Sequence, residues 1–387
     1  MRITSSSVVF AALCSLGFAQ EPGKVSVIIS FKDVVSADVL AQHGVVANGD
    51  VFGAEAVTAQ VSASVAMQMR KHPEIDAVEI DHVASAYGPG NGGGPGGGGP
   101  GGGGPGGGGG GGGGGSASQS TPAGITRVGG TTTASGVVVA IIDSGIDLDH
   151  PDLAGNIVGD VNFVKNGSGD DDNGHGSHCA GTVAAIDNTE GVVGVVNNAS
   201  LLAVKSLDRR GNGSYSDIIS GINWAAANGA DIISMSLGGS ASTSGLQSAC
   251  SNAASSSLLV AAAGNDGDCD LSTNEINYPA YYNSVVSVGA TSTESTSYDA
   301  LMCFSSSNPD VELSAPGYNV NSCWKGGSYK ISDGTSMACP HVAGCAAALW
   351  SGSPNNVLNT LINYSDDAGP SGFDNGWGHG VAEWFNN

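Results

Sequence analysis

Short apolar runs recur in the second half of the chain, each followed by glycine or a polar residue. Residues 137–142, 232–235 and 258–263 are apolar at nearly every position. Runs of this kind predict strands buried on both faces, as in parallel sheets. Two stretches of small residues predict buried helices, one that opens at His175 and runs through Thr182, and one that opens at Ser336 and reaches Trp350. We therefore expect an α/β domain in three layers, with a mainly parallel central sheet between helices.

The segment from 24 to 87 follows a different pattern and predicts a small α+β unit. Strands are expected at 25–29 and 78–80, and helices around 37–41 and 61–70. A unit of about 65 residues is marginal as an independent fold, so we expect it to need a partner surface.

The two parts are joined by residues 88–115, which are almost wholly glycine with four prolines. This composition cannot bury apolar area, so 88–117 is predicted to be a flexible linker. Residues 1–19 form a short apolar stretch after Met1 and Arg2, which predicts a secretory signal cut after Ala19. No later apolar run reaches the roughly 18 residues that span a membrane. We expect a secreted chain without a membrane partner.

Charge and cysteine content narrow the function classes further. The formal net charge is −23, from 12 Lys and Arg against 35 Asp and Glu. This balance argues against a nucleic-acid or anionic-membrane partner, because either needs clustered basic side chains. Of 8 cysteines, Cys14 leaves with the signal, and the odd remainder in an oxidising compartment predicts at least one free thiol. The spacing leaves the pairing open.

The stretch 334–344 holds the first candidate for chemistry. Ser336 opens a run of small apolar residues and should lie at a helix N-terminus, where unpaired N–H groups and the helix dipole favour negative charge. That environment suits an oxygen nucleophile. Pro340 lacks the N–H that would bond the Ser336 carbonyl, so the helix start should be perturbed. A core helix capped by Thr and Ser is the ordinary alternative for a lone Gly-Thr-Ser.

Three more polar residues stand where predicted elements begin or end. Asp143 follows the first apolar run, Asn265 follows the third, and His175 opens the first small-residue helix, with His178 three residues on. Ligand sites of α/β sheets lie at the carboxyl ends of the strands. Taken singly, each residue has a plainer interpretation, as a loop aspartate, a turn asparagine or a structural histidine.

The strings around Asp143, His175 and Ser336 resemble the motifs of the subtilisin-like serine proteases, the subtilase family, and stand in that family's order. The resemblance implies a serine endopeptidase that works through an acyl-enzyme. His175 would take the Ser336 proton and Asp143 would orient the imidazole. Asn265 would donate to the oxyanion together with the Ser336 N–H. His178 would be a structural hydrogen-bonding residue.

The resemblance also implies a substrate cleft. Ser236, Leu237 and Gly238 would line it, because glycine at a strand end lets a substrate backbone pair as an added strand. A structural Gly-Gly turn is the alternative. Asn277 corresponds to the floor of the pocket for the residue before the cut, and asparagine should make it shallow and polar. Tyr87, the expected processing residue, is large and aromatic, so the preference of this pocket stays open.

A structural calcium site is implied as well. Oxygen-only ligation, mostly from backbone carbonyls, suits Ca²⁺ better than zinc. The implied ligands are the side chains of Gln119, Asp152 and Asn188 and the carbonyls of Ile186, Glu190 and Val192. Alternatively, Asp152 only caps a helix. A second cation near Glu312 is a further implication.

For the cysteines, the likeness implies a disulfide between Cys269 and Cys303. Cys179 follows His178 inside a predicted buried helix, and we expect it to stay a free thiol.

The likeness covers residues 24–87 and 118–385 and implies a zymogen. Residues 20–87 would be an inhibitory and chaperoning propeptide whose tail lies in the cleft, with the cut after Tyr87 or near Ser118. A loosely ordered tail is the alternative. Residues 118–387 would be the peptidase domain. The Gly-rich linker should reach about 30 Å, against a radius of gyration of about 18 Å for the domain, so the calcium site should fill before processing.

Together these observations predict a secreted, monomeric serine endopeptidase made as an autoprocessed zymogen. Polypeptides would be its substrates, and its own propeptide would be its chaperone and inhibitor. A catalytically silent binding module is the main alternative, but such a protein usually lacks a triad residue. A Gly-rich structural protein is a second alternative, and it would need the tract at 88–115 to dominate the mature chain.

Overall fold

The computed structural model describes residues 23–87, 118–165, 167–293 and 299–385. They divide into two compact units, one formed by the chain up to Val51 with 55–81, the other by 52–54 with His82 onward. The predicted signal (1–19), Cys14 and the predicted linker (88–117) lie outside the described residues.

The first unit is a small α+β fold, as its pattern predicts. Its antiparallel sheet has the order β2-β3-β1-β4. Strands β2 and β3 were not predicted. The helix expected at 61–70 begins only at Ala63, because Ser62 ends β3 and its hydroxyl caps the helix by accepting the Val65 N–H. The elements are β1 Lys24–Phe31, α2 Ala37–Gln42, β2 Ala47–Asp50, β3 Ala56–Ser62, α3 Ala63–Met69 and β4 Ile75–Ile80.

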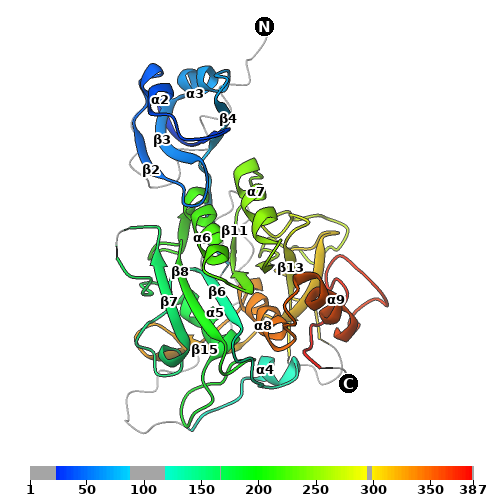
Figure 1. The fold of residues 1–387 in the computed structure, drawn as a ribbon. Coiled ribbons are helices and arrows are strands. Elements are labelled where there is room, and N and C mark those ends of the chain that lie inside the picture. Colours follow the sequence, from blue (N-terminus) through cyan, green and yellow to red (C-terminus); the bar gives the residue numbers. More distant parts are fainter. Residues whose placement is uncertain (1–22, 88–117, 166, 294–298, 386–387) are drawn as a thin grey trace. The chain divides into compact units, whose positions relative to one another are not determined.

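The second unit is built on a seven-stranded sheet in which every neighbouring pair is parallel (Figure 1). Its order is β14-β13-β12-β10-β6-β8-β7. The three apolar runs of the sequence form β6, β10 and β12, which are neighbours in the middle of the sheet and almost wholly buried. The strands are β6 Val138–Asp143, β7 Ile157–Asn162, β8 Ser200–Lys205, β10 Ile232–Met235, β12 Leu258–Ala262, β13 Val286–Thr291 and β14 Val311–Pro316.

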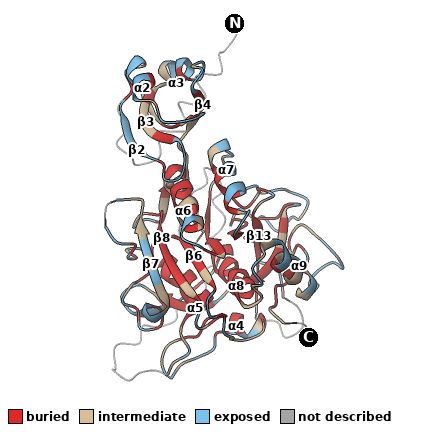
Figure 2. Cartoon of the chain, viewed as in Figure 1, coloured by how far each residue is buried: buried red, intermediate tan, exposed pale blue. Residues whose placement is uncertain are grey.

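Helices cover the sheet and complete the predicted three-layer α/β architecture. Helix α8 packs on β10, β12, β13 and β14 and against α5, while α6 packs against α7 and on β6, β8 and β10. Figure 2 shows α5 and α8 in the buried colour, and their small side chains allow this close packing. The helices are α4 Ala123–Arg127, α5 His175–Ala184, α6 Tyr215–Ala227, α7 Ser244–Ala253, α8 Thr335–Ala348 and α9 Pro354–Tyr364.

Two smaller sheets complete the second unit. Strand β5 (Val83–Ala86) lies between β11 (Leu237–Gly238) and β9 (Asn212–Ser214) and is antiparallel to both. The segment before Tyr87 is therefore a central strand, in contrast to the loosely ordered tail considered as an alternative. Strands β15 (Val320–Trp324) and β16 (Ser328–Ser332) form a hairpin.

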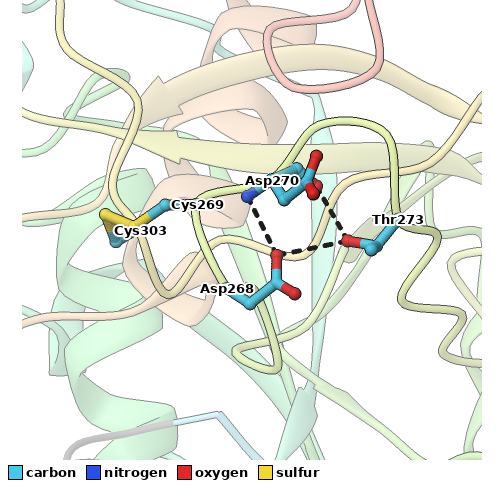
Figure 3. The surroundings of a disulfide bond; sticks show 5 residues. All are labelled: Asp268, Cys269, Asp270, Thr273 and Cys303. Carbon is cyan, nitrogen blue, oxygen red and sulfur yellow. Dashed lines mark hydrogen bonds between the residues drawn. A yellow bond between two sulfur atoms is a disulfide. The ribbon is translucent and has the colours of Figure 1, made fainter.

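A disulfide joins Cys269 to Cys303, the pairing that the resemblance implied (Figure 3). Beside it, the Asp268 carboxylate accepts hydrogen bonds from the Asp270 N–H and the Thr273 hydroxyl, which hold this exposed loop in a turn. Cys179 is a free thiol, as expected. Within the described ranges, the free cysteines are all buried: Cys179, Cys250, Cys323, Cys339 and Cys345. Across the described ranges, no helix has the length and hydropathy to span a bilayer.

Candidate active site

Asp143, His175 and Ser336 all stand at the end of an element of the second unit. Asp143 is the last residue of β6, His175 the first of α5 and Ser336 the second of α8. All three are buried, at 0%, 5% and 0% exposure. Element ends carry these side chains because the groups there are not committed to sheet or helix pairing and the chain can turn toward the cleft.

The Asp143 carboxylate holds the His175 imidazole. Nδ1 of His175 lies 2.9 Å from both carboxylate oxygens. Burial alone would lower the pKa of His175, but the charge of Asp143 and this hydrogen bond outweigh it and raise the pKa above its usual value. Because Nδ1 carries the ring proton and donates it to Asp143, Nε2 is the acceptor, and it has no hydrogen-bond partner within the described part of the chain.

His178 has a different environment. Its Nε2 lies 3.1 Å from the Val320 carbonyl and 3.0 Å from the Lys330 carbonyl, on the two strands of the hairpin. Burial lowers the pKa of His178 to about 3. The ring is therefore neutral and fixes α5 to the hairpin, which is a structural contact.

Tyr87 directly follows β5 and hydrogen-bonds the Ser336 hydroxyl. The Tyr87 N–H donates to Ser336 Oγ at 3.0 Å, and Ser336 Oγ donates to the Ser236 carbonyl at 2.9 Å. The structure brings Asp143 and His175 together but forms no hydrogen bond between Ser336 Oγ and Nε2 of His175. The hydroxyl must rotate away from Ser236 before the imidazole can take its proton.

Pro340 has the effect on Ser336 that its missing N–H predicts. The Ser336 carbonyl accepts instead from the Ser236 hydroxyl at 2.9 Å and from the Cys179 thiol at 3.5 Å. These side chains come from the end of β10 and from α5, so the nucleophile's backbone is anchored to both neighbouring elements.

The Asn265 amide follows β12 and is aimed by Thr335. Its Oδ1 accepts from the Thr335 N–H at 3.0 Å and from the Thr335 hydroxyl at 2.9 Å. The amide NH₂ therefore points the other way and donates to the Tyr87 carbonyl at 3.1 Å. A Cβ at Gly334, where φ is 142°, would collide with this carbonyl oxygen, so glycine keeps the position open.

The cleft binds β5 as an added strand. Leu237 pairs with Ala86 and Gly238 with Ser85, while β9 pairs with the opposite edge. A Cβ at Gly238 would collide with the Tyr87 ring, so the absent side chain makes room for it. This strand pairing is at odds with a purely structural Gly-Gly turn.

Asn277 is 5% exposed and hydrogen-bonds Asp266, whose charge acts on Tyr87. Its amide donates to Asp266 Oδ2 at 3.0 Å and to the Ala263 carbonyl at 3.4 Å. The Tyr87 hydroxyl is buried without a hydrogen-bond partner in the described residues. Burial, with the charge of Asp266, raises the pKa of Tyr87 well above its usual value. The pocket thus holds an aromatic ring while the Asn277 amide is turned to other partners.

The six candidate calcium ligands form one hydrogen-bonded cluster. Gln119 Nε2 donates to the carbonyls of Ile186 at 2.7 Å and Val192 at 3.2 Å. The Asn188 amide donates to Asp152 Oδ1 at 2.7 Å, and Asn188 Oδ1 accepts the Glu190 N–H at 2.7 Å. Asp152 and the three carbonyls offer oxygens, and turning over the amides of Gln119 and Asn188 would add two more, which fits a hard cation such as Ca²⁺.

Asp152 and Glu312 test two further expectations. Asp152 Oδ2 accepts the Val192 N–H at 3.0 Å, and Asp152 does not cap the short helix that follows, so the capping alternative has no support. Burial raises the pKa of Glu312 to about 8, although its carboxylate accepts the Ser287 N–H. Among the described residues, Glu312 belongs to no group of three potential metal ligands.

Several residues of the site gave no usable signal in the sequence. Thr335 aims Asn265, Gly334 leaves room for a carbonyl oxygen, and β9 forms the second wall of the cleft. Asp171 underlies the start of α5, although the acidic run at 170–172 reads as a solvated charge cluster. Their roles depend on spatial neighbours, which a motif search along the chain does not contain.

Comparison with known proteins places this geometry in context. The family model described as "Subtilase family" matches residues 134–380. Subtilisin E of Bacillus subtilis (strain 168) is 37% identical over 368 residues, which cover 90% of this chain and 87% of that protein. Subtilisin DY of Bacillus licheniformis is 46% identical over 241 residues, covering 61% and 85%. An intracellular serine protease of Paenibacillus polymyxa is 47% identical over 224 residues, covering 56% and 68%.

Proposed function

Because this chain belongs to the subtilase family and is a serine-type endopeptidase, we propose that Asp143, His175 and Ser336 are its catalytic triad. One observation carries the proposal, namely the position of the Tyr87 peptide. Its N–H lies 3.0 Å from Ser336 Oγ, and its carbonyl oxygen lies 3.1 Å from Asn265 Nδ2. A carbonyl held there has a nucleophile beside it and a donor at its oxygen.

In the proposed reaction, Ser336 attacks the carbonyl carbon while Nε2 of His175 takes its proton. Asp143 keeps the Nδ1 proton in place and stabilises the imidazolium that forms. Asn265 and the Ser336 N–H donate to the oxyanion. The imidazolium then protonates the leaving amine, and a water molecule repeats the sequence on the acyl-enzyme. The fixed orientation of the Asn265 amide means that its donor needs no rearrangement at the transition state.

The substrate binds by strand addition in this proposal. Ser236, Leu237 and Gly238 pair with the residues before the cut, and Gly238 admits a large side chain immediately before it, beside Asn277. The support is β5, which already pairs with β11 in this way. An aromatic residue at the position of Tyr87 is the expected preference.

We also propose that the chain is a secreted zymogen. Residues 1–19 would be the signal, 20–87 the inhibitory propeptide, 88–117 the linker and 118–387 the peptidase domain. The composition of 1–19 supports secretion, and the contacts of Tyr87 support a cut that follows it. In the uncut chain, β5 excludes other polypeptides from the cleft.

A structural calcium ion is the proposed cofactor. The side chains of Gln119, Asp152 and Asn188 and the carbonyls of Ile186, Glu190 and Val192 would hold it. When bound, the ion supplies positive charge that fixes three separate segments together. It takes no part in peptide hydrolysis.

The test compares the full-length chain with its Ser336→Ala variant. The unaltered chain should cut itself, and N-terminal sequencing should find Gly88 as the new terminus. It should hydrolyse an unfolded protein and take up a phosphonofluoridate on Ser336, whereas the variant should do none of these. A folded, calcium-loaded chain that neither cleaves unfolded protein nor is labelled on Ser336 would overturn the proposed triad.

A further inference from the structure

We propose that Asp171 is a positioning residue of the triad, on which both the acid and the base depend. Its carboxylate is 6% exposed and accepts five hydrogen bonds from neutral donors. Oδ1 accepts from Ser144 Oγ at 2.8 Å and from the N–H groups of Asn173 at 2.9 Å and Gly174 at 2.8 Å. Oδ2 accepts the N–H of Ser177 at 3.0 Å and its hydroxyl at 2.7 Å. Burial raises the pKa of Asp171, and these donated hydrogen bonds oppose the rise because they favour the ionised form, so we take the group as a carboxylate.

One side of Asp171 fixes the start of α5. The N-cap residue Gly174 has φ of 111° and no side chain with which to cap the helix. The Asp171 carboxylate takes this part from three residues upstream, satisfying the N–H groups of Gly174 and Ser177. His175 lies between these two residues, so the first turn that carries the imidazole is held by this carboxylate.

The other side of Asp171 reaches the end of β6 through Ser144. The Ser144 hydroxyl donates to Asp171 and accepts the Gly176 N–H at 3.0 Å. The Ser144 N–H donates to Asp143 Oδ1 at 2.7 Å. One buried carboxylate therefore ties the strand end that carries Asp143 to the helix start that carries His175.

The charge of Asp171 also acts on the imidazole. The charged and titratable groups that face His175 are Asp143 on β6, Asp171 before α5, His178 and Cys179 on α5, and Lys330 on β16. Asp143 and Asp171 favour the imidazolium and Lys330 opposes it. Removing the Asp171 charge should therefore make His175 harder to protonate, which a purely structural role would not do.

The test uses Asp171→Asn, with Asp170→Asn as its matched control. Asp170 is an exposed neighbour whose carboxylate accepts the Leu148 N–H, so the control removes the same charge outside the network. We expect Asp171→Asn to lower kcat by about 10²-fold, with KM little changed. The acid limb of the pH profile of kcat/KM should move to lower pH. In the control, both kcat and the pH of this acid limb should be unchanged.

A second variant covers the case in which Asp171→Asn does not fold. Ser144→Ala removes one of the five hydrogen bonds to the Asp171 carboxylate and leaves four. It should lower kcat about tenfold without moving the acid limb of the pH profile. A folded Asp171→Asn with kcat within about threefold of the unaltered chain and an unmoved limb would overturn the proposal, as would Ser144→Ala with full kcat. Failure of the triad itself would appear differently, as an unaltered chain that is inactive.

A different observation carries a second inference, which rests on the proposed calcium site and cut. We propose that the calcium site assembles before the chain is cut after Tyr87. In the same uncut chain, Tyr87 contacts Ser336 while Gln119 Nε2 reaches the Ile186 carbonyl at 2.7 Å. The flanking backbone is paired as well, with the Ser120 N–H 2.9 Å from the Gly191 carbonyl.

Tyr87 does not have to leave the Ser336 site for Gln119 to reach the calcium site. Residues 88–117 separate the two, a length that reaches about 30 Å as coil and at most about 100 Å when extended. Calcium should therefore bind the uncut chain and stabilise it, because a ligand that binds only the folded form shifts the folding equilibrium toward it.

The test is calorimetric calcium titration of the uncut Ser336→Ala chain and of the cut chain after labelling of Ser336. The two affinities should agree within about threefold. Gln119→Ala should weaken both by a similar factor, which shows that Gln119 contributes before the cut. Affinity more than about tenfold weaker in the uncut chain would overturn this inference alone. Absence of calcium binding in both forms would overturn the proposed calcium site with it.

Discussion

The Ser336 site and the loop around Gln119 and Asn188 differ in how far the fold completes them. At the Ser336 site, each functional group stands at the end of a buried element and has a fixed partner. Asp143 orients His175, and Thr335 aims the Asn265 amide. At the loop, the groups come from three separate segments. The Gln119 amide donates to the Ile186 carbonyl, and the Asn188 amide donates to the Asp152 carboxylate.

The difference lies in what balances the polar groups. At the Ser336 site the oxygens of Asp143 and Asn265 meet donors of the protein, and Nε2 of His175 stays open to take the Ser336 proton, so this geometry forms without a ligand. At the loop, the side-chain amides of Gln119 and Asn188 donate to the oxygens of Ile186, Val192 and Asp152, a place that a cation can take instead. Substitutions at the first site should therefore affect turnover and leave stability nearly unchanged, and substitutions at the second should do the reverse. The following experiments break or sharpen this division.

The largest effect on turnover should come from Asp143→Asn. The amide favours the wrong imidazole tautomer and supplies no charge, so kcat should fall by about 10⁴-fold. Asp143 raises the pKa of His175 against the effect of burial, so activity is lost as pH falls through a value above 6.5. Loss of the carboxylate should move this acid limb to lower pH. A pH series of kcat/KM measures it, and an unmoved limb would contradict the assignment of His175 as base.

Asn265→Leu should have the next largest effect. Removing one oxyanion donor typically lowers kcat by about 10²–10³-fold, with KM little changed because the donor acts mainly in the transition state. Thr335→Val is the graded control, since it leaves the Thr335 N–H to aim the amide and should lower kcat less. Equal losses in both variants would show that Asn265 acts through structure. Steady-state kinetics and thermal unfolding together separate the two cases.

Gln119→Ala should change stability and leave turnover alone. It removes one oxygen ligand, so calcium affinity should fall by about tenfold or more, and the unfolding temperature in limiting calcium should fall with it. At saturating calcium, kcat should equal that of the unaltered chain. Calcium titration and differential scanning calorimetry use Ser336→Ala backgrounds, and kcat is measured on the chain that keeps Ser336. A large loss of kcat at saturating calcium would show that the two sites are coupled.

The smallest effect should come from Glu312→Gln, at a partly buried group that neither site uses. The folded-state pKa of Glu312 is about 8 against 4.5 for an ordinary glutamate. Its contribution is therefore fully present below 4.5 and is lost as pH rises through about 8. On a Ser336→Ala background, the free energy of unfolding should fall less from pH 5 to pH 9 in the Glu312→Gln variant than in the chain that keeps Glu312. These two values are roughly the window set by the pKa shift. Urea unfolding at both values tests this, and parallel losses would rule out the raised pKa.

The sequence predicted the three middle strands of the central sheet because they are marked locally, whereas β7, β8, β13 and β14 were not predicted. The runs that form β6, β10 and β12 are apolar at nearly every position, and no partner is needed to read them. Strands β2 and β3 were missed, since β2 is exposed along its length and has no apolar pattern. The helix at 61–70 was predicted to begin two residues too early. An apolar Val61 followed by a polar Ser62 is compatible with the end of a strand as well as with the start of a helix.

For the candidate site, the sequence nominated the residues and the structure supplied their relations. Asp143, His175, Ser336 and Asn265 could be proposed from strings of neighbours along the chain. Asp171 could not, because the five groups that bond it come partly from Ser144, 27 positions away. The direction of the Asn265 amide was equally hidden, since it depends on Thr335, which is 70 positions distant.

The sequence alone determined which segments would be buried and which chemistry would stand at their ends, because hydrophobic pattern and residue type act over a few neighbouring positions. Only the tertiary structure decided which ends meet, which hydroxyl faces which carbonyl and which amide oxygen is already taken. Those choices follow from burying surfaces far apart in the chain against each other, and from the requirement that every buried polar group find a partner there.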